Sequence, residues 1–266
     1  MIIYGSRMYG KSQQVKTFGA CDHCGAYGQQ TNYFGRKFGH LYFIPLIPMG
    51  GRVRVLFQCS KCDMGSHVPE DEVPRLTRRL TEAMKPAIEA VNDGKDTFVD
   101  ADGDTVHTGA QLAGPVITLH ACGVGDSVHG ILDAIPEDSQ AYHLVDAADL
   151  AVIGHDEEAI AAYKKAISVN PEDPVPFHLF GDFCVNTGRL PLARDIFEKV
   201  LELTPNSVSV VARLADIAEG MKDYEAICDY YEQLFELQPE LLKQKKLVKT
   251  YKKACKKSGR ETVALN

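Results

Sequence analysis

In residues 190–205, LPLARDIFEKVLELTP, the aromatic residue Phe197 stands eight positions before Pro205. The same spacing recurs with a period of 34 residues, at Tyr163 and Pro171 and again at Tyr231 and Pro239. A period of this length indicates a solenoid of helix pairs, because one pair is too small to bury its apolar face and must stack on a neighbour. The sequence therefore predicts an all-α repeat array over residues 138–240, of the kind that presents a recognition surface.

The prolines divide this region into units of roughly 140–173, 174–207 and 208–240, each a pair of helices. The helices of a pair are expected to join at Gly154, Gly188 or Lys222. The pattern resembles the tetratricopeptide repeat, and the middle unit is the best match. The resemblance implies two positions for small residues, which let paired helices approach. The first falls on Ala147, Gly181 and Ala215, and the second on Ala159, Ala193 and Ile227, where Ile227 departs from the pattern.

The resemblance also implies a concave groove lined by the first helix of each unit. The residues placed there are Leu144, Ala148, Ala151, His178, Asp182, Asn186, Arg213, Asp216 and Glu219. This set is apolar at one end and net acidic at the other. It lacks the lysine and asparagine pattern with which some members of the family hold a C-terminal carboxylate. We therefore expect a basic or apolar peptide ligand.

Residues 241–257, LLKQKKLVKTYKKACKK, alternate apolar and lysine residues with helical spacing. They predict a capping helix at the end of the array. Its lysine face is expected to be solvated, with binding to phosphates or membranes as the alternative.

Four of the eight cysteines form two CxxC pairs, Cys21 with Cys24 and Cys59 with Cys62. Two such turns can surround one metal ion with four thiolates, a set that zinc prefers. We expect structural zinc at this site. A rubredoxin-like iron centre and a redox or disulfide role are the alternatives. His23, His40 and His67 are expected to be ordinary surface or loop residues, with a place in or beside the metal site as the alternative.

The segments IIYGSR, CDHCG, HLYFIPLIPMG and FQCSKC resemble a family of small microbial zinc-ribbon proteins without an established activity. The resemblance covers about 65 residues and implies a structural zinc site on the same four cysteines. Residues 1–4, 39–46 and 52–58 have the composition of strands. The first domain is accordingly expected to be a β zinc ribbon over residues 1–66.

Two other motifs lie in this basic domain. Gly5, Gly10, Lys11 and Ser12 match a phosphate-binding loop, but the first CxxC turn follows too closely for the helix that such a loop must open. Arg36 and Lys37 lie among aromatic residues, a composition typical of nucleic-acid binding. An RNA- or DNA-associated protein is therefore the alternative function.

Residues 67–137 form an acidic middle segment. Apolar spacing predicts a helix over 69–92, and Asp102-Gly103 favours a two-residue hairpin turn between flanking strands. Near Pro136, the segment ILDAIPED resembles the later ISVNPED, so a degenerate half-repeat is expected to cap the array.

The net charge of −7 is unevenly distributed. Residues 1–62 carry 8 basic and 1 acidic residue, whereas residues 140–240 carry 7 basic and 19 acidic. No membrane-spanning segment or signal peptide is expected, and separated cysteines favour the cytoplasm. We found no set of residues suited to catalysis. The sequence therefore predicts an α+β protein that acts as an adaptor or scaffold and not as an enzyme.

Overall fold

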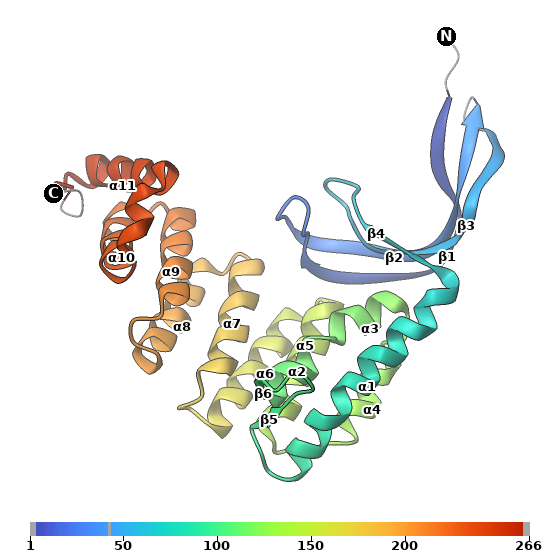
Figure 1. Ribbon diagram of the computed structural model, residues 1–266, viewed down its shortest axis with the longest axis horizontal. Coiled ribbons are helices and arrows are strands. Elements are labelled where there is room, and N and C mark those ends of the chain that lie inside the picture. The colour runs from blue at the N-terminus through green and yellow to red at the C-terminus, as the bar shows by residue number, and fades with distance from the viewer. Residues whose placement is uncertain (1–3, 42–43, 263–266) are drawn as a thin grey trace. The chain divides into compact units, whose positions relative to one another are not determined.

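The computed structural model describes residues 4–41 and 44–262 (Figure 1). The chain divides into two compact units, Met1–Asn170 and Pro171–Asn266, which are described separately. Strands 1–4 and 39–46 were expected from the sequence. Residues 1–3 and 42–43 of these strands lie outside the described part of the chain.

The first unit begins with an antiparallel sheet of order β1-β2-β3-β4. Its strands are β1 (Tyr4–Ala20), β2 (Tyr27–Leu41), β3 (Ile44–Cys59) and β4 (Ser66–Pro69). The strand pairing is irregular at several positions, and Gln13 and Phe57 adopt positive φ angles of 47° and 57°. Such irregularities bend long strands. The motif that resembles a phosphate-binding loop lies inside β1 and opens no helix, as expected.

The acidic middle segment follows the sheet. It contains the 3-10 turn η1 (Glu70–Glu72) and helix α1 (Val73–Asn92), which confirms the helix expected there. Strands β5 (Thr97–Val99) and β6 (Thr105–His107) form the expected hairpin. The loop spans residues 100–104 and is longer than the two-residue turn that was expected. Within it, the Asp100 carboxylate accepts hydrogen bonds from the backbone N–H groups of Asp102 and Asp104.

Five more helices complete the first unit. They are α2 (Thr108–Ala113), α3 (Val116–Cys122), α4 (Asp126–Leu132), α5 (Gln140–Ile153) and α6 (Asp156–Val169). Ser139 caps α5 by accepting a hydrogen bond from the Tyr142 backbone N–H, and Gly154 ends this helix at φ 85°. Side chains from α1 to α5 share one core, which includes Met84, Leu112, Leu119 and Val145.

The sheet packs directly against these helices. Arg54 of β3 is fully buried and donates hydrogen bonds to the backbone oxygens of Ala121 in α3 and Gln13 in β1. At a second contact, Phe18 of β1 packs against Gly154, where a Cβ atom would lie only 2.9 Å from the phenyl ring. The sheet and the helices of the first unit therefore pack as one structure.

The second unit contains two helix pairs and a terminal helix. The pairs are α7 (Pro174–Asn186) with α8 (Leu190–Leu203), and α9 (Val208–Met221) with α10 (Tyr224–Leu237). The turns within the pairs contain Gly188 and Lys222, as the sequence predicted, and both residues adopt a positive φ. The turn η2 (Pro239–Lys243) leads to α11 (Lys245–Ser258), which confirms the capping helix.

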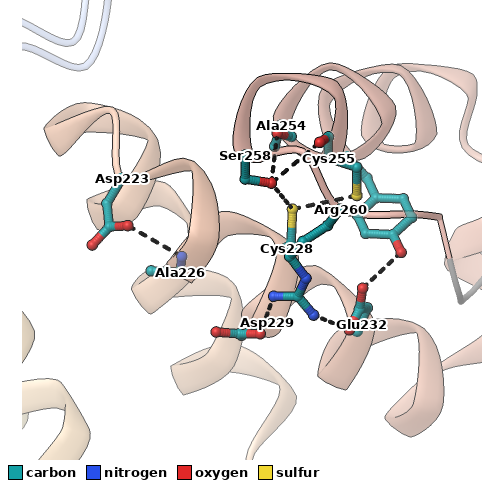
Figure 2. A network of polar contacts seen from close by, with 10 residues as sticks. Asp223, Ala226, Cys228, Asp229, Glu232, Ala254, Cys255, Ser258 and Arg260 are labelled. Carbon is teal, nitrogen blue, oxygen red and sulfur yellow. Dashed lines mark hydrogen bonds and ion pairs between the residues drawn. The ribbon is translucent and has the colours of Figure 1, made fainter.

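Helix α11 is held on α10 by apolar packing and by polar contacts (Figure 2). Cys228 and Cys255 bring their sulfur atoms within 3.3 Å, and Arg260 forms ion pairs with Asp229 and Glu232. Tyr251 is fully buried, and its hydroxyl donates to Glu232 at 2.8 Å. The apolar face of α11 is thereby covered, while its lysines face solvent.

Among the described residues, no helix is long and apolar enough to cross a membrane.

Candidate metal centre and repeat surface

The two CxxC turns meet at one end of the sheet. Cys21 follows β1 and Cys59 ends β3, so the pairing of both strands with β2 brings the two turns together. The Cys21 and Cys62 sulfur atoms lie 3.7 Å apart, and those of Cys24 and Cys59 lie 3.8 Å apart. All four lie within 4.8 Å of one another. The structure therefore brings together all four cysteines that the sequence singled out.

These distances fit a tetrahedral metal ion. With metal–sulfur bonds of about 2.3 Å, the sulfur atoms of a tetrahedral site lie about 3.8 Å apart. The local backbone supports the same geometry. Gly25 and Asp63 follow the two turns at φ 68° and 60°, and their N–H groups donate to the backbone oxygens of Cys21 and Cys59.

One thiol is poised for deprotonation. Backbone N–H groups of Cys62 and Lys61 point at the sulfur atom of Cys59 and lower its pKa to about 7. Such N–H groups stabilise a thiolate ligand. Within the described residues, the cluster contains no histidine, so His23, His40 and His67 are not among its members.

The helix pairs of the second unit show the packing that the 34-residue period predicts. Gly181 of α7 faces Phe197 of α8, and a Cβ atom at Gly181 would lie 2.6 Å from the phenyl ring. The equivalent residues of the next pair, Ala215 and Tyr231, are 2% and 4% exposed. A small residue on the first helix thus makes room for the aromatic residue of the second helix.

Comparison with known families agrees with this geometry. The family model described as "Tetratricopeptide repeat" matches residues 153–173 and 208–241. The chain carries tetratricopeptide repeats. The middle unit, expected to be the best match, lies outside the matched residues, although α7 and α8 have the same arrangement. Together with the sheet and its four-cysteine cluster, which are consistent with a zinc ribbon, the repeats give an α+β protein.

No curated protein matches the chain. Among solved structures, the chain is similar to one described as "Crystal structure of MamA protein". The two are 19% identical, the alignment covers 66% of this chain and 97% of that chain, and the TM-score is 0.40.

In the first tetratricopeptide repeat, the expected groove residues are largely covered by the middle segment. Leu144 is fully buried and packs against Gly109 of α2, and Ala148 packs against the core shared by α1 to α5. The prediction that Leu144 lines an open groove is therefore wrong, and Ala148 is half-buried. The physical reason is that α2, α3 and α4 pack on α5. Ala151, the third residue predicted here, is half-buried.

A buried pair of polar groups reinforces this cover. His120 of α3 lies 2.6 Å from the carboxylate of Asp149 in α5, and both side chains are mostly buried. The sequence analysis missed this contact, because neither residue has a spacing that connects it with the other.

The remaining groove residues belong to the second unit. On α7, His178 and Asn186 are half-buried, and burial lowers the pKa of His178. Asp182 pairs with Arg213 of α9, through a 3.0 Å contact from the guanidinium Nε and a second from its terminal nitrogen. The charge of Asp182 is thus compensated within the protein.

Two acids on α9 complete the set. Asp216 and Glu219 reach the surface, and the hydroxyl of Tyr231 donates to Glu219 at 2.7 Å. Partial desolvation and the nearby charge of Glu219 raise the pKa of Asp216. The surplus of negative charge on this surface therefore lies on α9.

The two cations considered for nucleic-acid binding, Arg36 and Lys37, are exposed on β2. Arg36 donates a hydrogen bond to the backbone oxygen of Gly50 at 2.8 Å. The aromatic residues beside them are engaged in packing. Tyr33 is fully buried, and Phe34 lies beneath the guanidinium groups of Arg52 and Arg54.

Proposed function

We propose that the protein is an adaptor whose tetratricopeptide repeats bind a basic protein segment, with a zinc ribbon as a structural part of the first unit. The observation that carries the proposal is the exposed acidic pair on α9, Asp216 and Glu219, in which partial desolvation and the charge of Glu219 raise the pKa of Asp216. Tetratricopeptide repeats support protein–protein interaction, and this pair specifies the chemistry of the partner.

The electrostatics of α9 favour a cationic group. Asp182 already has its counterion in Arg213, whereas Asp216 is held beside a second acid in a partly desolvated position. A lysine or arginine side chain from a ligand would relieve the repulsion between Asp216 and Glu219. An acidic ligand would increase it.

The metal site supports a structural role for zinc. Four thiolates form a closed tetrahedral shell, which leaves no position for a substrate or a reactive water. The site lies at the end of a sheet that also contacts α3 and α5. The bound ion would fix the two turns and, through β1 and β3, the surface against which the helices pack.

This adaptor needs no catalytic group. Its thiolate site and its buried cysteines, Cys122 and Cys184, are compatible with a reducing compartment. We place it in the cytoplasm on that basis.

Fluorescence anisotropy tests the proposal with two labelled peptides of equal length. One peptide alternates lysine with apolar residues, and the other alternates glutamate with the same apolar residues. The basic peptide is expected to bind, and Asp216→Asn should weaken it by about threefold to tenfold.

The matched control is Glu236→Gln, which removes one negative charge from the exposed surface of α10. It should leave the affinity unchanged. Tighter binding of the acidic peptide, or equal effects of the two substitutions, would contradict the proposed ligand chemistry.

Nucleic-acid binding through Arg36 and Lys37 is the second candidate. The exposure of both cations favours it, but the buried and covered aromatic residues next to them do not, because single strands bind largely by stacking on free aromatic faces.

A further inference from the structure

The end of the sheet opposite the cysteine cluster exposes large apolar side chains. Ile44, Ile47 and Met49 of β3 are 61%, 67% and 50% exposed. They follow one another closely along one strand, and Pro45 and Pro48 between them are exposed too. Single exposed apolar residues are ordinary, but three on one short strand segment form an apolar patch, and such patches are typical of binding surfaces. We call residues 44–49 the apolar strand end.

Cations lie beside this strand end. Arg36 pairs in register with Arg52, and Lys37 is the next residue along β2. Ile47 pairs with Gly39, which is three residues from Arg36 and therefore roughly 10 Å along the strand. Asp22, in the first CxxC turn, is the only acidic residue among residues 1–62. Arg52 forms an ion pair with Glu70, so the surplus of positive charge beside the apolar strand end lies on Arg36 and Lys37.

The backbone of this strand end disfavours a further strand as its partner. Strand β4 pairs with β3 only from Val53 to Leu56, so the described part of β3 before Val53 has β2 on one side and no strand on the other. Pro45 and Pro48 remove two backbone donors from this segment. Prolines on an edge strand hinder pairing with a second chain, and they leave fewer N–H groups to satisfy in an apolar phase.

The side chains also distinguish a lipid surface from a nucleic acid. Isoleucine and methionine offer no stacking face. Among the aromatic residues nearby, Tyr33 and Phe34 are buried or covered by cations, and the half-buried Phe38 packs edge-to-face with Tyr9. Aliphatic side chains within about 10 Å of exposed cations match the boundary between acyl chains and anionic headgroups, where interfacial segments insert to about 5–10 Å.

We propose that the apolar strand end docks on anionic lipid membranes. Ile44, Ile47 and Met49 enter the acyl boundary, while Arg36 and Lys37 contact the lipid phosphates. This attachment is peripheral, and it is independent of the ligand that the repeats bind.

Vesicle flotation of the full chain tests this inference. The vesicles contain either phosphatidylcholine alone or equal parts of phosphatidylcholine and phosphatidylglycerol. The protein should float only with the anionic vesicles. Ile47→Ser should reduce the bound fraction about tenfold, and the double change Arg36→Gln with Lys37→Gln should reduce it at least as much.

Two controls separate this surface from others. Val99→Ser removes an apolar side chain of similar exposure, 64%, from the β5–β6 hairpin, and it should have no effect. Lys249→Gln with Lys252→Gln removes two exposed cations from α11, and it should also have no effect. Loss of binding with the α11 variant alone would overturn the inference.

Two further outcomes would also overturn it. One is equal binding to both kinds of vesicle. In the other, the protein binds neither kind of vesicle but binds a labelled single-stranded RNA. That RNA binding would be lost with the Arg36 and Lys37 changes but kept with Ile47→Ser. Circular dichroism of each variant would show that the fold is retained.

Discussion

The guanidinium group of Arg54 donates two hydrogen bonds, of 2.9 and 2.7 Å, to the backbone oxygen of Ala121. The first residue belongs to the sheet and the second to α3, so this contact joins two parts of the first unit that are far apart in sequence. Burial lowers the pKa of Arg54. The guanidinium group still stays charged, because the ordinary pKa of arginine is very high.

Replacing this arginine should weaken the whole first unit. Arg54→Met keeps much of the side-chain volume but leaves the oxygens of Ala121 and Gln13 without their donor. We expect a loss of about 2–4 kcal/mol in the free energy of unfolding, measured by urea denaturation. The control Arg52→Met changes an exposed arginine two positions away, and it should cost less than about 1 kcal/mol. Equal losses would show that the buried contact is energetically unimportant.

The metal site gives a second prediction. The purified chain should contain about one zinc ion, measured by mass spectrometry of the metal, because four thiolates fill a single tetrahedral shell. Cys59→Ser should lose the metal and expose β1 and β3 to protease. Cys184→Ser changes a buried cysteine of α7 outside the cluster and should keep the metal. Retention of zinc by Cys59→Ser would refute the four-cysteine site, and iron in place of zinc would correct the identity of the ion.

The packing of small and aromatic residues gives a third prediction. Gly181→Ala places a methyl group 2.6 Å from the ring of Phe197, so the pair of α7 and α8 must shift. We expect destabilisation by about 1–3 kcal/mol, seen as a lower melting temperature. In Gly130→Ala, the new Cβ meets no atom within 4 Å on α4. That control should be neutral or stabilising by up to about 1 kcal/mol, since alanine favours helix. Similar responses of the two variants would argue against close packing at Gly181.

A fourth prediction concerns pH. Burial and the neighbouring Asp149 raise the pKa of Asp146. A raised pKa means that the folded state favours the protonated acid, so stability contributed by this proton is present below the ordinary carboxyl pKa and is lost as pH rises through the folded value. Asp146→Asn should therefore be more stable than the natural chain at pH 7, by urea denaturation.

That difference should shrink as pH falls toward the ordinary value, about 3.9. The control Asp195→Asn, at an exposed position on α8, should show no such trend. A stability difference for Asp146→Asn that grows on acidification would show that the sign of the pKa shift is wrong.

The repeat turns could be predicted because they depend on local chemistry. Gly154, Gly188 and Lys222 interrupt helical patterns at a fixed period, and each adopts a positive φ in the structure. The cysteine cluster could be predicted equally well, because the CxxC spacing alone brings two sulfur atoms to one side of a turn.

The cover on α5 could not be predicted in the same way. Leu144 has the character of a groove residue when its own repeat is considered alone, and only the packing of α2 buries it. The burial of Arg54 could not be predicted from its own segment either. The alternating segment RVRVLFQ correctly predicts a strand, and alternation would place both arginines on a solvent face. Helix α3 packs over that face at Arg54, but Arg52 remains exposed.

Helices α2 to α4 on α5, and α11 on α10, together restrict how the repeat region can change in length. A 34-residue unit duplicated within residues 156–237 would leave both terminal covers on the helices they now protect. A unit added before α5 or after α10 would strip one of these covers and expose a core face to water. Duplication of a repeat is thus compatible with the packing only in the interior of the array. Such a duplication would lengthen the binding surface and leave both terminal covers unchanged.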